Sequence, residues 1–488
     1  MKFDSAKRQA YYADAHVRAR LDDFFGGAFL GQGSAVYFTP GTDSESHYRE
    51  QHSLRTMEEG MASGEELNRS LWDRESLVAH LDVEYVNFDF PFEVYTDPRR
   101  AFELQEPVRQ TVRRVLCRYG ISPLEVMTGR GYHFVWRIRR DSPQFEQLVS
   151  IGRISESLTS LYAGNAAPDG DRVSPHLGKA FAGLGILMEY LAHGIKSEAG
   201  SLTAVPIEMG AIEVGPGEYG REMISLDITE YGDPLIVRSV RAPFSVYLKP
   251  WQQPWLAHGE ELEMLEPIFC IPSRGLNPAD ALRLRSSPEA VQALAAHSST
   301  LIPDFSAEHE YLIHGYRSSP LHQFHEWYYS TEHDPIEAWT ETYDRTDLQV
   351  MPTCLRQALA CPNDALLRPG WVRRLVRVLL SMGWHPRHIA GLLRSKYERD
   401  HDWGEQWFHC DPCTRADFYA RVFSGLIMMR VDGLVDFNCQ SAREEGLCSV
   451  SQCSGNLMLY RQSLIDRKRY ERLAHSPFHG LYVPESHP

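Results

Sequence analysis

The chain lacks a long uninterrupted run of apolar residues. No stretch of its 488 residues reaches the ~18 consecutive apolar residues that a membrane-spanning helix needs. Residues 1–8 are largely polar and charged, unlike the apolar core of a secretion signal. Internal repeats and low-complexity tracts are also missing. We therefore expect a globular, soluble, cytoplasmic protein that does not have a membrane as a partner.

Positive charge is in deficit, with 50 Lys and Arg against 65 Asp and Glu and a net charge of −15. This balance argues against a uniformly basic surface for nucleic acid. The deficit is uneven, because residues 351–488 hold 18 Lys and Arg against 14 Asp and Glu, whereas residues 1–350 carry a net charge of −19. The basic C-terminal third permits local binding of phosphate groups.

Cysteine is nearly absent before residue 350, where only Cys117 and Cys270 occur, whereas seven of the nine cysteines follow. In a reducing compartment this clustering favours metal binding over disulfide bonds. Four thiolates can hold a 4Fe–4S cluster or, alternatively, one structural Zn²⁺ ion. The four candidate ligands are Cys354, Cys439, Cys448 and Cys453. The other interpretation is that all seven are reduced thiols buried as small hydrophobic residues.

A further pair of thiols lies in Cys410-Asp411-Pro412-Cys413, and His401 and His409 are close to it in the sequence. Such a C-x-x-C pair is half of a typical zinc site. No second half is evident along the chain, so the ligand set stays open. Cys361 has no assignment.

Two carboxylates stand two residues apart in the apolar stretch from Leu81 to Val86. Since side chains i and i+2 of a strand point to one face, Asp82 and Glu84 are expected to lie side by side. Adjacent carboxylates repel and need a counter-cation, and Mg²⁺ or Mn²⁺ prefers oxygen ligands of this kind. Asp227 lies in a similar apolar setting, and three such acids would suit a two-metal nucleotidyl-transfer site. The alternative is a pair of solvated acids on an exposed strand face.

The segment from Thr128 to His133 predicts a tight turn with two glycines. Glycines expose backbone N–H groups and let a phosphate approach closely. Arg130 can form a fork of hydrogen bonds to phosphate oxygens, and His133 can donate to a triphosphate. The alternative is a plain hairpin whose glycines satisfy only the turn geometry.

Arg241, Ser245 and Lys249 recur every four residues. On a strand this even spacing would place all three on one face, where they would offer cation, hydroxyl and cation to a ligand. The alternative is a row of exposed polar residues on an edge strand. A second basic set, Arg373, Arg374 and Arg377, lies on a predicted amphipathic helix. These arginines are candidates for phosphate contacts with a template, or else form a solvated basic face.

The order of the predicted elements indicates an α+β fold. A helix at 99–119 follows the N-cap pair Asp97-Pro98 and ends at Gly120, and two strands joined by the glycine turn come next, at 124–127 and 132–138. Strand, helix, strand and strand form a compact sheet unit. Further predicted helices lie at 4–25, 53–71, 142–161, 177–194, 372–382, 386–397 and 414–429, and further strands at 35–39, 203–214, 223–228 and 237–249.

In this order the motifs resemble those of the archaeo-eukaryotic primase and primase-polymerase superfamily, with both primase subunits joined in one polypeptide. Asp82-Val83-Glu84 is similar to the first motif of the small catalytic subunit, in its Asp-x-Glu form. The segment from Gly129 to His133 is similar to the second motif, whose His contacts the incoming nucleotide, and Asp227 resembles the third metal-binding acid. Residues 241–249 resemble the downstream Arg-x-Pro-x-Ser-x-His-x-Lys segment, with Tyr247 in place of the His.

The C-terminal part resembles the iron–sulfur domain of the large primase subunit. Pro352-Thr353-Cys354 is similar to a Pro-Pro-Cys motif of that domain, and the spacing from Cys439 to Cys448 resembles that of its paired ligands. This resemblance implies a 4Fe–4S cluster held by the four candidate cysteines. Together, the resemblances to the two primase subunits cover about residues 79–250 and 350–455.

The resemblance implies a primase catalytic domain with a mixed or antiparallel sheet and an RRM-like core at 79–250, preceded by an N-terminal α/β portion at 1–78. A connector with short helices would span 251–349, and an all-α iron–sulfur domain would span 350–488. The implied activity is that of a DNA primase, which makes primers on single-stranded DNA from nucleoside triphosphates. Mg²⁺ or Mn²⁺ would bind Asp82, Glu84 and Asp227. The implied nucleotide-binding residues are Arg130, His133, Arg241, Ser245 and Lys249.

Two other functions stay open. One is a non-catalytic nucleic-acid-binding protein that keeps the fold and the cluster as structure, and the other is a metal-dependent nuclease. The glycine turn and Lys249 favour triphosphate binding over hydrolysis. A helicase or another replication or defence protein is a further conceivable partner.

Overall fold

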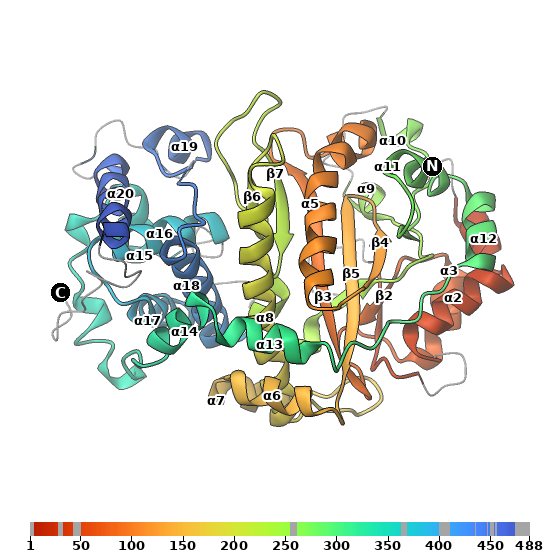
Figure 1. The fold of residues 1–488 in the computed structure, drawn as a ribbon, viewed down its shortest axis with the longest axis horizontal. Helices are drawn as coiled ribbons and strands as arrows, with labels where there is room; N and C mark the ends of the chain where they lie inside the picture. Colours follow the sequence, from red (N-terminus) through yellow and green to blue (C-terminus); the bar gives the residue numbers. More distant parts are fainter. Residues whose placement is uncertain are drawn as a thin grey trace. The chain divides into compact units, whose positions relative to one another are not determined.

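The structure, a computed structural model, describes residues 4–27, 33–41, 50–253, 261–362, 368–399, 410–434, 436–446, 448, 453 and 456–473. The chain divides into two compact units (Figure 1). The first comprises residues 1–209 and 222–313, and the second comprises residues 210–221 and 314–488. This division differs from the expected breaks at 250 and 350, because residues 261–313 pack with the first unit. No helix in the described part of the chain combines the length and apolar character needed to cross a membrane.

The first unit contains two sheets, and its architecture confirms the expected α+β class with a mixed sheet. The larger sheet has six strands in the order β6-β7-β3-β5-β4-β9, in which β6 and β7 are parallel and the other neighbours are antiparallel. Its strands are β3 (Ser76–Asn87), β4 (Leu124–Met127), β5 (Gly131–Arg139), β6 (Ile207–Met209), β7 (Glu222–Asp227) and β9 (Ile271–Pro272). The smaller, antiparallel sheet is formed by β1 (Phe38–Pro40), β2 (Leu67–Ser70) and β8 (Ser239–Arg241).

Strand β3 is the centre of the larger sheet. Its β-branched and aliphatic residues favour a strand, and it pairs with β5 on one edge and β7 on the other. Leu81, Val83 and Tyr85 are buried, whereas Asp82 and Glu84 between them are partly accessible. The alternation predicted from the sequence is therefore confirmed, and it separates an apolar face from an acidic one.

Two long helices, α5 (Pro98–Arg118) and α8 (Pro175–Ala199), pack side by side against the apolar face of β3 (Figure 1). Helix α5 begins as predicted, with Pro98 in its first turn and the Asp97 side chain accepting a hydrogen bond from the backbone N–H of Arg100. Gly120 follows its end with a φ of 76°, a left-handed conformation that glycine adopts without strain. The helices leave the acidic face of β3 turned away from them.

The N-terminal region differs from the expected continuous helices. Residues 4–25 form two helices, α1 (Ser5–Tyr12) and α2 (Ala15–Phe25), because the Asp14 side chain caps the second one. The helix expected at 53–71 is confined to a short turn and α3 (Met57–Ser63), since β2 occupies residues 67–70. The remaining helices of this unit are α4 (Glu93–Thr96), α6 (Pro143–Ile151), α7 (Glu156–Gly164), α9 (Lys249–Gln252), α10 (Glu261–Met264), α11 (Pro278–Leu284), α12 (Pro288–His297) and the start of α13 (His309–Arg317).

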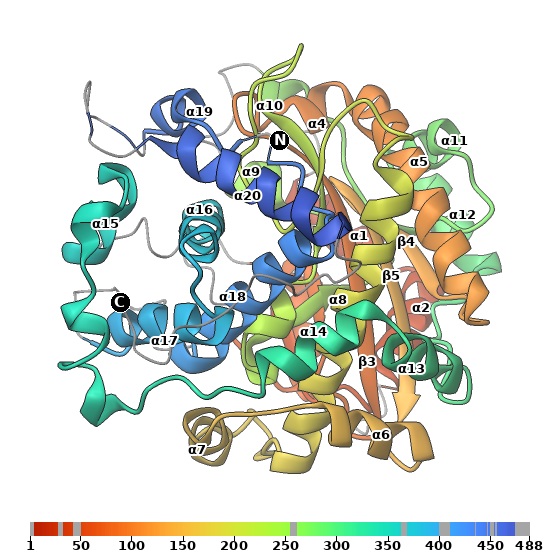
Figure 2. The ribbon, with the colours of Figure 1, turned by 60° about the vertical axis from the view of Figure 1, so that its left-hand side comes forward.

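The described residues of the second unit form helices, turns and loops, with one isolated bridge between Gly217 and Gly220. Its helices are α14 (Pro320–Tyr328), α15 (Thr353–Ala360), α16 (Pro369–Ser381), α17 (Pro386–Tyr397), α18 (Pro412–Met428), α19 (Cys439–Glu444) and α20 (Leu457–Leu473). Helix α18 packs against both α16 and α17, and α20 packs against α16 (Figure 2). The three helices predicted after residue 370 are confirmed within two or three residues at each end.

Candidate functional site

The three acids predicted to act together lie on neighbouring strands. Asp82 of β3 pairs directly with Asp227 of β7 on one side and with His133 of β5 on the other. Directly paired residues of neighbouring strands point to the same face of a sheet, and Glu84 follows Asp82 on that face. Residues far apart in the sequence are thereby brought to one patch on the acidic side of the central strand.

Asp82 is the acid of this patch whose negative charge is least balanced by neighbouring groups. Burial raises its pKa well above the usual value, and the neighbouring charges of Glu84 and Asp227 raise it further. Its Oδ1 atom is buried without a hydrogen-bond partner among the described residues, and the imidazole Nε2 atom of His133 lies 3.6 Å away. Such an orphaned acceptor beside two other acids is an electrostatic deficit that a bound cation would remove.

Glu84 lies in the opposite electrostatic situation. Burial would raise its pKa, but the positive charges of Arg130, Lys249 and Arg241 outweigh burial and lower it. Arg130 Nη1 lies 3.8 Å from Glu84 Oε2. Three of the five predicted nucleotide-binding residues are therefore gathered near this end of the acidic patch.

Asp227 is held by the turn that follows its strand. Its Oδ1 atom accepts hydrogen bonds from Thr229, at 2.8 Å from the backbone nitrogen and 2.6 Å from the hydroxyl. The same turn carries Glu230, whose carboxylate lies 2.8 Å from His80 Nδ1. One side chain of the turn thus fixes Asp227 at the end of β7, and another contacts His80 on β3.

His80 and Glu230 are site residues that the sequence analysis missed. His80 lies two residues before Asp82 on the same face of β3, and its ring meets that of His133 edge to face at 4.6 Å. Its Nε2 atom is buried without a hydrogen-bond partner among the described residues. The sequence did contain a signal for His80, because His80, Asp82 and Glu84 are spaced by two residues and so share one face of a strand. Nothing in the sequence indicated that Glu230 would orient the imidazole of His80.

The prediction that Arg241, Ser245 and Lys249 share a strand face is wrong. Strand β8 ends at Arg241, Phe244 adopts a left-handed φ of 65°, and Lys249 begins helix α9. The hydroxyl of Ser245 is fully buried, where it accepts a hydrogen bond from the Leu67 N–H at 2.7 Å. Ser245 therefore joins two backbone segments and does not face a ligand.

Arg241 is already engaged by protein groups. Its Nε atom lies 2.8 Å from the buried Glu66 carboxylate, and its guanidinium lies 4.9 Å from the centre of the Tyr247 ring. Tyr247, which replaces the His of the resembled segment, is within hydrogen-bond distance of the Tyr95 hydroxyl at 3.1 Å. Arg241 thus contributes its charge to the site from a fixed position.

The glycines of the turn are required for packing. A Cβ atom on Gly131 would lie 1.8 Å from the Val83 carbonyl oxygen, and one on Gly129 would lie 2.2 Å from the Tyr247 ring. Neither glycine has a positive φ. The space that these glycines leave is filled by β3 and by Tyr247, so the sequence-based idea that they admit a phosphate is not what the geometry favours.

The chemistry of the acidic patch fits divalent ions, since it offers three carboxylates, one of which has a buried oxygen without a hydrogen-bond partner among the described residues. Its three carboxylates are not among the sets of described residues whose ligand atoms all lie within 4.8 Å of one another. This spacing does not suit one ion shared by all three. It is compatible with two ions ~3.5–4 Å apart, each bound by part of the set.

The four candidate cluster thiols are neighbours in the second unit. Burial raises the pKa of Cys354 to about 11, and the charges of Cys448, Cys439 and Cys453 raise it too, which shows that all four lie within electrostatic range. They form no set with atoms within 4.8 Å of one another. A tetrahedral zinc site with Zn–S bonds of ~2.3 Å needs sulfur atoms closer than that. The four thiols are thus neighbours, and both the 4Fe–4S cluster and the single zinc ion stay open as occupants.

The prediction that Arg373, Arg374 and Arg377 contact a template is wrong, and so is the alternative of a solvated face. All three side chains are about 1% exposed. Arg373 Nη2 lies 2.7 Å from Asp436, and Arg377 Nε lies 2.8 Å from Asp432. Arg374 pairs with Glu445. Each acid lies 55–71 residues after the arginine that it pairs with, so the pairing left no local signal in the sequence.

The remaining cysteine predictions have mixed outcomes. His401 and His409 lie outside the described residues. Cys410 Sγ lies 4.0 Å from Arg415, whereas Cys413 lies beside His333 and Asp417.

Comparison of the chain with protein-family models, with curated proteins and with solved structures finds no match. The primase resemblance therefore depends on the motifs and on the geometry described above.

Proposed function

We propose that the chain is a template-dependent nucleotidyltransferase, a DNA primase or primase-polymerase that makes primers on single-stranded DNA from nucleoside triphosphates. The observation that carries this proposal is the convergence of Asp82, Glu84 and Asp227 on one face of neighbouring strands. A cationic group of Arg130, Arg241 and Lys249 lies near Glu84, where the phosphates of a nucleotide would be neutralised.

In this proposal Asp82, Glu84 and Asp227 hold two Mg²⁺ or Mn²⁺ ions. When bound, the ions supply activation of the attacking 3′-hydroxyl and charge neutralisation at the transferred phosphate. Asp82 and Asp227 occupy the strand positions between His133 and the turn at Thr229, so their carboxylates are fixed before a substrate arrives. Preorganised charges of this kind lower the reorganisation that the reaction needs.

The chain's own cations would bind the triphosphate. Arg130 and Lys249 contribute positive charge beside Glu84, and Arg241 adds its charge from its fixed pairing with Glu66. His133 lies next to Asp82, where an imidazole N–H can donate to a phosphate oxygen. Glu230 orients His80, which contacts the His133 ring and so positions it.

The second unit would carry a 4Fe–4S cluster on Cys354, Cys439, Cys448 and Cys453. Support comes from the proximity of the four thiols, since Cys448, Cys439 and Cys453 all act on the pKa of Cys354. Arg374 lies in the same environment, because its charge lowers the pKa of Cys354 while its guanidinium pairs with Glu445. This buried ion pair ties the segment between Cys439 and Cys448 to α16.

The test uses the full chain with single-stranded DNA, labelled nucleoside triphosphates and either Mg²⁺ or Mn²⁺. We expect metal-dependent incorporation that falls by at least ~10³-fold in Asp227→Asn, because metal-borne stabilisation is worth several kcal/mol. The matched control, Glu103→Gln, alters an exposed acid of α5 and should leave the rate unchanged. Full activity of Asp227→Asn would contradict the proposal. Metal-dependent degradation of labelled DNA without nucleotide would point to a nuclease, and metal-independent DNA binding without incorporation to a non-catalytic binding protein.

A further inference from the structure

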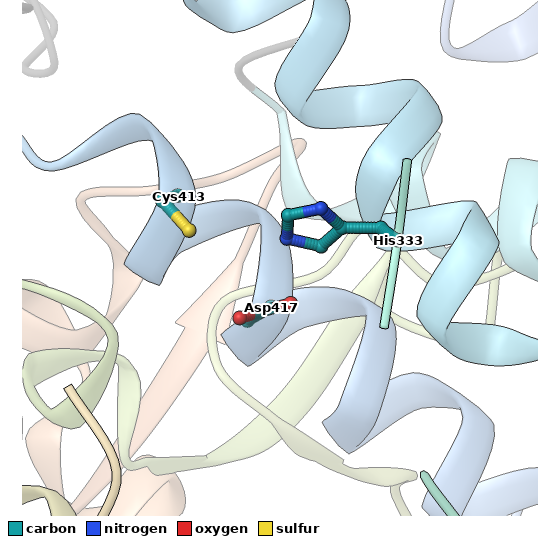
Figure 3. Close-up of side chains that lie close together, drawn as sticks. All are labelled: His333, Cys413 and Asp417. Atoms are coloured by element: carbon teal, nitrogen blue, oxygen red, sulfur yellow. The ribbon is translucent and has the colours of Figure 1, made fainter. Parts of the chain in front are cut away.

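A second potential metal site lies in the helical unit and plays no part in the function proposed above. His333, Cys413 and Asp417 each offer a ligand atom, and these three atoms lie within 4.8 Å of one another (Figure 3). The sulfur of Cys413, the ring of His333 and the carboxylate of Asp417 surround a common space in this view. A neutral nitrogen, a sulfur and a carboxylate oxygen form a ligand set typical of zinc.

The fold brings these residues together from two segments. Cys413 and Asp417 are one turn apart on α18, so their side chains lie on the same side of the helix. His333 comes from the segment after α14 and reaches the site against α17, where Gly391 leaves room for it. A Cβ atom on Gly391 would lie 2.7 Å from the His333 Cβ atom and 2.1 Å from the Tyr343 hydroxyl. The close approach of this segment to α17 therefore depends on a glycine.

Each of these three side chains has an atom that can serve as a metal ligand. His333 Nδ1 lies 3.4 Å from the Asp334 carbonyl oxygen, which leaves Nε2 as the ligand atom, and Arg394 Nη1 now lies 3.5 Å from it. Arg387 and the Tyr328 hydroxyl both contact Asp417 through Oδ1, the latter at 3.2 Å. No described residue donates a hydrogen bond to Oδ2. Cys413 is a free thiol and is 5% exposed.

Two guanidinium groups border the site, and each has its own carboxylate. Arg387 pairs with Glu332 at 2.9 Å as well as with Asp417, and Arg394 pairs with Glu398. Counting these pairs as neutral leaves Asp417 as one net negative charge when Cys413 is protonated. A divalent ion with a Cys413 thiolate would bring the site to neutrality. Arg394 Nη1 now lies 3.5 Å from His333 Nε2, and it would turn aside toward Glu398 on binding.

The two ligands differ in how ready they are to bind an ion. Burial lowers the pKa of His333, which keeps the imidazole neutral and its lone pair available. Burial raises the pKa of Cys413 to about 12, and Asp417 raises it too, so the thiol is protonated before an ion arrives. Binding would exchange the S–H proton for a metal–sulfur bond and release that proton to solvent.

We propose that His333, Cys413 and Asp417 bind one zinc-class divalent cation, with solvent as the fourth ligand. The ion links the segment after α14 to the N-terminal turn of α18 and closes a loop of about 80 residues between His333 and Cys413. It also gives Cys413 of the C-x-x-C pair the partners that the sequence did not reveal. Cys410 has no part in it, since its thiol lies beside Arg415.

Cobalt binding to the full chain tests this proposal. We expect metal-depleted wild-type protein, kept anaerobic, to take up Co²⁺ with a thiolate-to-cobalt charge-transfer band and the visible bands of a tetrahedral site. Cys413→Ser should lose the charge-transfer band. His333→Asn and Asp417→Asn should weaken Co²⁺ binding by at least about tenfold, as expected for loss of one ligand. Competition with Zn²⁺ should bleach the spectrum.

Cys410→Ser is the matched control, because it removes a thiol three residues away that does not face the site, and its spectrum should match the wild type. A band that survives Cys413→Ser but disappears in Cys354→Ser would place cobalt on the other thiols and overturn the proposal. Absence of any band in wild-type protein would overturn it as well. Circular dichroism of each metal-free variant separates loss of a ligand from loss of the fold, and His333→Asn provides a ligand change outside α18. Primer synthesis has no part in this readout, so the result is independent of the function proposed above.

Discussion

Asp82 in the first unit and Asp436 in the second are both carboxylates withdrawn from solvent, yet their surroundings shift them in opposite directions. Burial, together with Glu84 and Asp227, raises the pKa of Asp82. Burial alone would raise the pKa of Asp436 as well, but Arg373, Arg377 and Arg374 hold it far below its usual range. Asp436 and Asp432 of the helical unit have their counter-charges within the protein, whereas the charges of the same sign around Asp82 outweigh those of opposite sign.

This difference separates a structural group from a binding group. The network of Arg373, Arg374 and Arg377 with Asp432, Asp436 and Glu445 is complete without a ligand, and it joins α16 to the segments around α19. In the acidic patch on β3, the negative charges around Asp82 are not balanced, whereas a group of cations lies near Glu84. Perturbed carboxylates of the second kind are typical of functional sites.

The largest expected effect comes from breaking the complete network. Asp436→Asn would leave Arg373 and Arg377 buried without their shared carboxylate, and we expect it to destabilise the helical unit by about 3–5 kcal/mol. Urea unfolding followed by circular dichroism measures this change.

Glu103→Gln provides the contrast for this measurement. Glu103 pairs with Arg99 at an exposed site on α5, so its loss should change stability by no more than about 0.5 kcal/mol. If Asp436→Asn unfolds at the same urea concentration as this control, the network does not have the structural role assigned to it.

A smaller effect should distinguish Lys249 from Ser245, which the sequence grouped together. Lys249→Gln removes a charge that acts on Glu84, and we expect the KM for nucleoside triphosphate to rise about 10- to 100-fold with little change in stability. Ser245→Ala leaves the Leu67 N–H buried without its acceptor, so it should cost about 1–2 kcal/mol of stability and leave KM unchanged. Steady-state kinetics and urea unfolding of both variants test the pair, and a raised KM in Ser245→Ala would return Ser245 to the nucleotide site.

The smallest effect is the pH dependence of Asp82. Its folded-state pKa lies above the unfolded value of ~3.9, so the stability that protonation contributes is fully present below about pH 4 and is lost as the pH rises through the folded pKa. We expect metal-free protein to gain stability on acidification from pH 8, by at most about 1.4 kcal/mol per pH unit for this one proton. Asp82→Asn should lack that gain.

Thermal unfolding between pH 8 and pH 4, with wild type and Asp82→Asn side by side, measures this difference. Asp432 of the helical unit does not titrate in that range, because Arg377 and Arg373 hold its pKa at about 2 against the opposing effect of burial. Burial raises the pKa of Glu445 to about 7, so this acid also gains a proton in that range, but it does so in both proteins and cancels in the comparison. The contribution of Asp432 to stability is present above the unfolded pKa of ~3.9 and is lost only below it. Identical pH profiles for the two proteins would show that Asp82 is compensated in the folded state.

The sequence predicted those parts of the molecule whose causes are local. The alternation in β3, the cap of α5 at Asp97 and the hairpin of β4 and β5 all arise from neighbouring residues, and each is present in the structure. The motif order predicted that Asp227 and Asp82 would lie together, and the two residues are directly paired between β7 and β3.

The failures have causes that are distant in the sequence. Helical periodicity places Arg373, Arg374 and Arg377 on a polar face, but their acidic partners come from beyond residue 430 and bury them. Even spacing from Arg241 to Lys249 indicated a strand, but the left-handed conformation of Phe244 interrupts it. His333 lies 80 residues from Cys413 and carries no pattern that would connect the two.

His133, Asp82 and Asp227 share one rung that crosses β5, β3 and β7. In a strand, a change in length by one residue turns every later side chain to the other face, whereas a change by two restores the original face. An odd insertion before Asp82 within β3 would therefore rotate the carboxylate toward α5 and α8, and an even one would slide it along the sheet. Insertions and deletions within these three strands must therefore have an even number of residues to keep the side chains on their faces, whereas the segments between the strands are free of that rule.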